Sequence, residues 1–145
     1  MNKLEYNTKA LNDIYKNAHI ALQSIADLLP DLPNHDIKTE LQNQYEGYDN
    51  FINKVSSYMA ENDIEPKDIS PLKKAMLWSS IKMKTLVNNS QNQIAEMMIK
   101  GTVMGITELS AMKNESQNLD EGVCKLLAEL LSLEEEYEER LKKFL

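Results

Sequence analysis

The chain has 145 residues, which fits one domain, and its 16 basic and 23 acidic side chains give a formal net charge of −7. This acidic balance argues against nucleic acid as a partner. The single cysteine, Cys124, excludes an intrachain disulfide framework and a cysteine-based metal cluster. The first residues, MNKLEYNTK, lack the apolar core of a secretory signal, and no apolar run is long enough to span a membrane. We therefore expect a cytoplasmic protein without a membrane span.

The first predicted helix covers residues 3–29. Asn2 followed by Glu5 has the spacing of a capping pair, and Pro30 ends the apolar pattern. One apolar row repeats every seven residues and consists of Leu4, Leu11, Ala18 and Ile25. Beside it runs a companion row of Ile14, Ala21 and Leu28. These rows form a wide apolar stripe that we expect to face a core.

A second helix is predicted over residues 35–61, with a stripe that includes Leu41, Tyr48 and Val55. After it comes a polar stretch with two prolines, and then a shorter helix is predicted over residues 71–87. Ser70 and Pro71 suit the N-cap and the first position of that helix.

Two further helices are predicted over residues 90–114 and 119–144. The first has apolar residues on two sides, so we expect it to be buried on two sides. Asn118 with Glu121 predicts the start of the second. The stripe of this last helix consists of Val123, Leu126, Leu127, Leu130, Leu133, Tyr137, Leu141 and Phe144.

Four helices of similar length predict an all-α fold in which residues 1–145 form one four-helix bundle. Short connections make the first pair and the last pair antiparallel hairpins. The long, partly helical connection over residues 62–89 is typical of a crossover between the hairpins, as in ferritin-like topology.

Several short motifs lie in the crossover and the helix after it: Glu65-Pro66, Ser70-Pro71 and Trp78, followed by Ile94-Ala95-Glu96-Met97-Met98 with Gly101 and Gly105. With these motifs the sequence resembles a group of uncharacterised bacterial ferritin-like four-helix-bundle proteins of unknown function. It implies the fold and the crossover, but it brings no established activity.

A ferritin-like fold raises the hypothesis of a dinuclear metal centre, which needs a Glu-x-x-His pair on two of the helices. The two histidines, His19 and His35, both lack a glutamate three residues before them. The mid-bundle positions are expected to form a dry apolar layer: Ala18, Ala21, Tyr48, Met98, Gly101, Leu127 and Leu130. We therefore predict no metal and no cofactor, with a weak site at His19 or Glu108 as an alternative.

Other candidate features favour structural roles. Glu108 is interpreted as the carboxylate best placed in a core row, hydrogen-bonded to an inward hydroxyl such as that of Tyr45 or Tyr48, whereas Glu134 is placed at a stripe edge. Cys124 is interpreted as a small residue at the core boundary. Methionines 97, 98, 104 and 112 are interpreted as core residues, with an adaptable ligand groove as the alternative.

The crossover helix carries the strongest signal for a partner. Leu77, Trp78 and Ile81 form a second apolar side on an otherwise basic helix and are the candidate oligomer interface. A homodimer is favoured, because symmetric dimers are the commonest soluble oligomers.

No catalytic motif is found, and no catalytic residue is assigned. The sequence thus favours a non-enzymatic homo-oligomeric protein with an interaction or structural role. Two alternatives stay open: a degenerate ferritin-like metal-binding protein or oxidoreductase with a weak site, and a carrier of a small apolar ligand in a methionine-lined core.

Overall fold

The computed structural model describes residues 1–32, 36–66 and 90–145. Within them lie four long helices: α1 (Lys3–Leu28), α2 (Asp36–Glu61), α4 (Gln91–Asn114) and α5 (Glu121–Lys142). Short 3-10 turns follow α1 and α4, at Leu29–Asp31 and Ser116–Asn118. The all-α four-helix bundle is confirmed. The predicted helix over residues 71–87, with Leu77, Trp78 and Ile81, lies outside the described residues.

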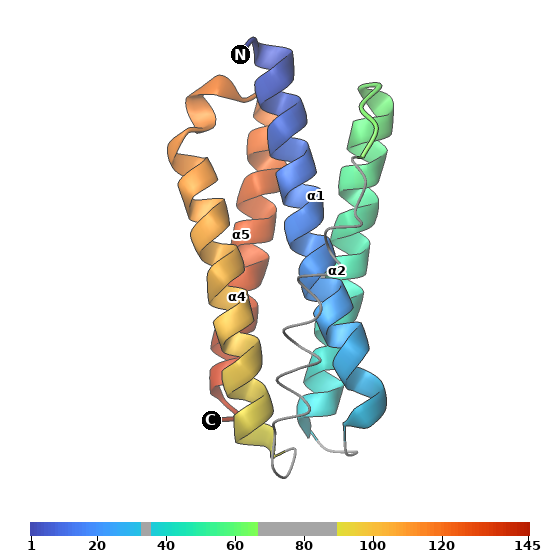
Figure 1. Ribbon diagram of the computed structural model, residues 1–145, viewed down its shortest axis with the longest axis vertical. Coiled ribbons are helices and arrows are strands. Elements are labelled where there is room, and N and C mark those ends of the chain that lie inside the picture. Colours follow the sequence, from blue (N-terminus) through green and yellow to red (C-terminus); the bar gives the residue numbers. More distant parts are fainter. Residues whose placement is uncertain (33–35, 67–89) are drawn as a thin grey trace.

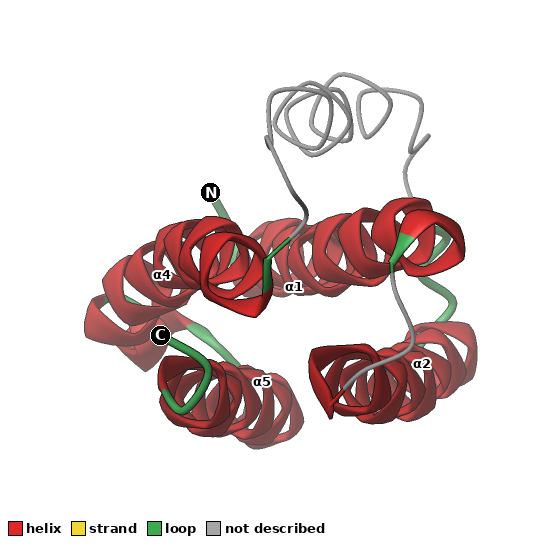
Figure 2. Cartoon of the chain, turned by 90° about the horizontal axis from the view of Figure 1, so that it is seen from below, coloured by secondary structure: helices red, strands yellow, loops and turns green. Residues whose placement is uncertain are grey.

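The helices form two antiparallel hairpins, α1 with α2 and α4 with α5 (Figure 1). Helix α2 ends at the end of the bundle where α1 begins, whereas α4 begins at the opposite end (Figure 1). Seen along the bundle, α1 and α4 form one layer and α2 and α5 the other (Figure 2). Two hairpins separated by a long connection are what the helix lengths predict, and ferritin-like classification itself stays a prediction.

Side-chain hydrogen bonds fix the starts of α1 and α5, one local and one between distant parts of the chain. The side chain of Asn2 accepts from the backbone N–H of Glu5 at 2.9 Å, as predicted. The predicted cap at Asn118 is wrong, because the N-cap of α5 is Asp120. Asn7 of α1 holds this cap through two 2.9 Å bonds: its Nδ2 donates to the Asp120 carboxylate, and its Oδ1 accepts from the Asp120 backbone N–H.

Replacing Asn7 with alanine is expected to lower the free energy of unfolding by about 1–2 kcal/mol, since it leaves the Asp120 backbone N–H without its acceptor and the Asp120 carboxylate with only the exposed ion pair to Lys3. Asn118→Ala is the matched control at the position that the sequence favoured, and we expect less than about 0.5 kcal/mol there. Urea denaturation of both variants measures the difference. Equal losses would contradict the assignment of the cap to the Asn7–Asp120 pair.

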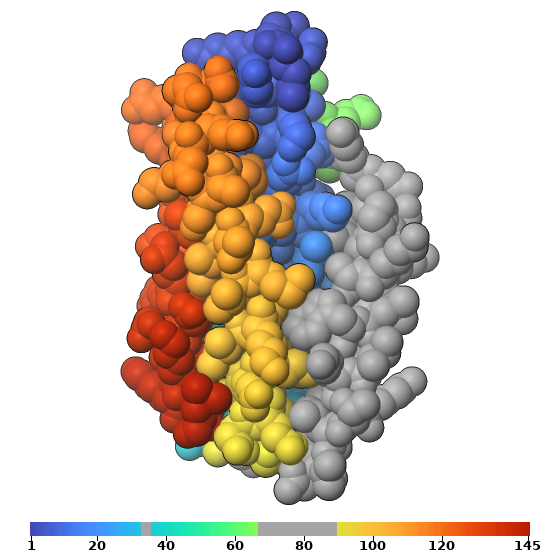
Figure 3. All heavy atoms as spheres, turned by 60° about the vertical axis from the view of Figure 1, so that its left-hand side comes forward, coloured from blue at the N-terminus to red at the C-terminus, as the bar shows by residue number. Residues whose placement is uncertain are grey.

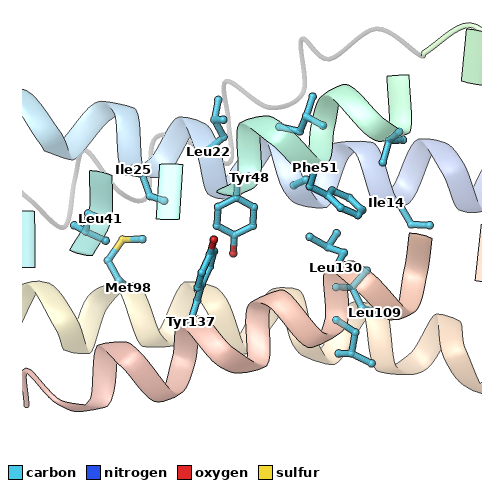
Figure 4. Close-up of a cluster of buried hydrophobic side chains, with 14 of the residues drawn as sticks. Ile14, Leu22, Ile25, Leu41, Tyr48, Phe51, Met98, Leu109, Leu130 and Tyr137 are labelled. Atoms are coloured by element: carbon cyan, nitrogen blue, oxygen red, sulfur yellow. The ribbon is translucent and has the colours of Figure 1, made fainter. Parts of the chain in front are cut away.

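The core runs along the bundle axis and joins apolar side chains from every helix (Figure 4). Two expectations about burial are wrong. Leu4, in the predicted core row, is 64% exposed because the first turn of α1 extends beyond the neighbouring helices (Figure 1). Helix α4 is not buried on two sides, because Val103 and Met104 are 40% and 69% exposed. Figure 3 shows α4 and α1 side by side on one face of the molecule. No helix of the described residues is long and apolar enough to cross a bilayer.

Candidate functional site

Polar side chains from all four helices meet near the middle of the bundle. They are Asn17 of α1, Tyr48 of α2, Glu108 of α4 and Glu134 of α5. The predicted dry apolar layer is therefore wrong at this level. Although Tyr48 and Leu130 are buried there as expected, Glu134 occupies the same layer and is only 1% exposed.

Among the residues that the structure describes, Glu134 is the buried carboxyl, and the prediction that Glu108 would take this place is wrong. Glu108 is exposed, whereas Glu134 accepts a long hydrogen bond of 3.5 Å from the hydroxyl of Tyr48 through Oε2. The Tyr48 hydroxyl, which the sequence offered as a partner of Glu108, thus donates to Glu134 instead. The other oxygen, Oε1, is buried and has no partner among the described residues.

Burial dominates the electrostatics of Glu134. Loss of water raises its pKa from 4.5 to about 8, with a smaller rise from the Glu108 charge and an opposing effect of the Tyr48 hydrogen bond. Burial and the Glu134 charge also raise the pKa of Tyr48 well above 10. At neutral pH the Glu134 carboxyl is therefore mostly protonated. Tyr137 packs edge-on against Tyr48 at 5.3 Å between ring centroids, with the two hydroxyls directed toward one another (Figure 4).

Gly105 of α4 makes the room for this carboxyl. A Cβ at Gly105 would lie 2.5 Å from Glu134 Oε1 and 3.3 Å from Asn17 Oδ1. Both contacts are closer than side chains normally allow, so the missing side chain lets α4 pass directly over the two polar groups. Glu134 Oε1 and Asn17 Oδ1 thus both lie next to the backbone of α4 at Gly105.

Asn17 connects α1 to α4. Its Nδ2 donates to the carbonyl of Gly105 at 3.2 Å and to Glu108 Oε2 at 3.4 Å. These two acceptors fix the orientation of the Asn17 amide. If the amide were reversed, its own oxygen would face the Gly105 carbonyl oxygen and Glu108 Oε2, and neither could donate a hydrogen bond to it. Asn17 is 5% exposed, and its Oδ1 has no partner among the described residues.

These groups line a cavity of about 250 Å³, larger than the ~150 Å³ that accommodates benzene in a protein core. It reaches the surface at Met104 and Glu108, which are both exposed. The remaining lining residues are Asn17, Ile20, Ala21, Ser24, Gln44, Tyr48, Met98, Gly101, Thr102, Gly105 and Glu134. Most of the wall is apolar, and the polar side chains of Asn17 and Glu134 lie beside Gly105.

His19 does not belong to this cavity. It packs against Tyr15 at 4.5 Å between ring centroids, neither ring nitrogen has a partner among the described residues, and burial lowers its pKa. Across the described part of the chain, no group of three or more His, Cys, Asp or Glu side chains is placed to hold a metal ion. Cys124 lies at the core boundary, as interpreted, with its Sγ near the carbonyls of Ser116 and Leu119.

Sequence reasoning missed Asn17 and placed Glu134 only at the edge of a stripe. A signal was present for both, because they occupy core rows at alternating spacings of three and four. Glu134 falls in the row Val123, Leu127, Leu130, Glu134, Tyr137 and Leu141, and Asn17 in the row Ala10, Ile14, Asn17, Ala21, Ser24 and Leu28. A polar residue within such a row is a candidate for a buried site.

The chain matches no protein-family model, no curated protein sequence and no solved structure.

Proposed function

We propose that the protein is a non-enzymatic carrier or sensor that binds one small, mainly apolar molecule in the cavity at the centre of the bundle. The observation that carries this proposal is a cavity of about 250 Å³ lined by Asn17 and Glu134, each of which has a buried side-chain oxygen without a partner among the described residues. A buried polar atom without a hydrogen bond is costly, and a ligand or ordered water that supplies the bond offsets that cost.

The chemistry of the walls supports a ligand more than a metal. Ile20, Ala21, Met98 and Met104 offer apolar and deformable surface. Two carboxyls alone make a poor donor set for a metal, since hard cations need several oxygen ligands. Among the classes that the sequence left open, the small-ligand carrier therefore has the best support. The homodimer through Leu77, Trp78 and Ile81, and a cytoplasmic location, stay predictions beside it.

Filling the cavity tests this function. We expect 1-hexanol, an apolar probe with one hydroxyl, to bind the wild type saturably at one site by isothermal calorimetry. Ala21→Leu places a larger side chain on the cavity wall and is expected to weaken that binding about tenfold or more. The matched control is Ala128→Leu, an exposed position on α5 outside the cavity, which should bind as the wild type does.

Circular dichroism of each variant checks that the helices are retained. Binding that is unaffected by Ala21→Leu, or no saturable binding of this probe or of its charged analogues below, would overturn the proposed function.

A further inference from the structure

The hydrogen-bond donors around the cavity are already engaged within the protein. Among the lining side chains, the amide nitrogen of Gln44 donates to Glu40 at 2.9 Å and the hydroxyl of Tyr48 donates to Glu134. The hydroxyls of Ser24 and Thr102 donate to carbonyls of their own helices at 2.8 Å. The amide nitrogen of Asn17 is likewise engaged. Apart from the exchangeable proton that the Glu134 carboxyl holds at neutral pH, a ligand therefore meets few available donors in these walls.

The vacant polar atoms are both oxygens. Asn17 Oδ1 can only accept, and Glu134 Oε1 accepts whenever the carboxyl is ionised. Within residues 1–32, 36–66 and 90–145, no lysine, arginine or histidine lines the cavity, whereas two carboxyls do. The site is thus built to receive hydrogen bonds and positive charge.

Resting on the proposed function, we propose that the ligand is a small primary alkylammonium ion. Its ammonium group donates to Asn17 Oδ1 and to the Glu134 carboxylate beside Gly105, and its apolar chain lies against Ile20, Ala21 and Met98. An ammonium has three donors, which is enough for both oxygens and for a water or for Glu108 at the cavity mouth. A carboxylate ligand would meet repulsion, and an alcohol has only one donor.

When the ligand binds, its ammonium group takes the place of the proton on the Glu134 carboxyl. In the free protein the Glu134 carboxyl holds a proton at neutral pH, and the arriving ammonium replaces it, so the proton leaves to solvent. In the described part of the chain, the groups that face Glu134 are Tyr48 from α2, Glu108 from α4 and the uncharged Asn17 from α1, with Tyr137 one turn along α5. None of these is a cation that would replace the ligand's charge.

The test compares three probes with the same six-carbon chain: n-hexylammonium, 1-hexanol and hexanoate. By calorimetry at pH 8 we expect hexylammonium to bind at least about tenfold more tightly than 1-hexanol, the ratio typical of a charged hydrogen bond, and hexanoate to give no measurable binding. Repeating the hexylammonium titration at pH 7 in buffers of different ionisation enthalpy should show release of about one proton per ligand bound.

Variants assign the effect to the two oxygens. Glu134→Gln keeps the shape but removes the ionisable group, so it should abolish proton release and the preference for ammonium while 1-hexanol still binds. Glu135→Gln, the exposed neighbour on the same helix, is the matched control and should retain both. Asn17→Ala provides a second variant, expected to weaken hexylammonium more than 1-hexanol.

The outcomes separate the two proposals. If 1-hexanol binds as tightly as hexylammonium, or if the ammonium preference survives in Glu134→Gln, the ammonium ligand is wrong and the carrier function stands. If none of the probes binds the wild type, both proposals fail.

Discussion

Glu134→Gln is expected to stabilise the protein at alkaline pH and to leave its stability almost unchanged below pH 4.5. In the fold the Glu134 pKa is raised from 4.5 to about 8 by burial. Between these values the native state holds a proton that the unfolded chain has lost, so the free energy of unfolding falls as pH rises. The neutral glutamine lacks this dependence. From the size of the shift, the variant should gain on the order of 3 to 5 kcal/mol over the wild type between pH 4 and pH 9.

Urea denaturation of both proteins over this pH range measures that gain. His19, whose pKa is lowered in the fold, costs stability as pH falls below 6.5, but it is present in both proteins and cancels in the difference. Glu108, whose pKa is also raised, contributes in the same direction as Glu134 in each. Glu135→Gln should follow the wild-type curve. If the free energy of unfolding depended on pH in the same way for the wild type and Glu134→Gln, the Glu134 carboxyl would be solvated in the fold and the prediction would be wrong.

Leu11→Ala is expected to lower the free energy of unfolding by about 2 to 5 kcal/mol, whereas Leu4→Ala should change it by less than about 0.5 kcal/mol. The two leucines belong to the same apolar row of α1, one heptad apart, and undergo the same substitution. They differ in environment, since Leu11 is fully buried and Leu4 is 64% exposed. A cavity forms only where neighbouring helices enclose the deleted methyl groups.

Denaturant midpoints for the two variants, measured under one condition, decide this prediction. The slopes of the two transitions should agree with that of the wild type, because neither change alters the extent of unfolding. A similar loss at both positions would mean that the first turn of α1 is covered in solution. That result would point to an interface at this end of the bundle.

Local sequence signals determined much of the architecture. The period of the apolar residues, Pro30 and the pairing of Asn2 with Glu5 depend on near neighbours in the chain. For the four long helices that the structure describes, the predicted bounds agree with the structure to within two residues. The cap of α5 was placed wrongly, at Asn118 rather than Asp120, because Asp120 is held by Asn7, which lies 113 residues away in the chain.

The candidate site was only partly accessible to this reasoning. The methionine-lined groove was one of the alternatives, and Met98 and Met104 do line the cavity. Glu134 was placed at the edge of a stripe because it stands in a run of glutamates whose other members are solvated. The spacing of the apolar residues on α5 shows that position 134 faces the core. It does not show that the neighbouring helix leaves space for a carboxyl there.

The four long helices, their lengths and their order in two hairpins follow from the residue sequence, because periodicity and short connections are local properties of the chain. Which positions of each stripe are enclosed, and which polar groups converge, depends on how the helices pack together. Asn17 and Glu134 meet because Gly105 lets α4 approach them closely, and that contact joins residues 88 and 29 positions away from the glycine. Burial is a property of all the surrounding helices at once, so the raised pKa of Glu134 and the cavity beside it arise only when the bundle is assembled.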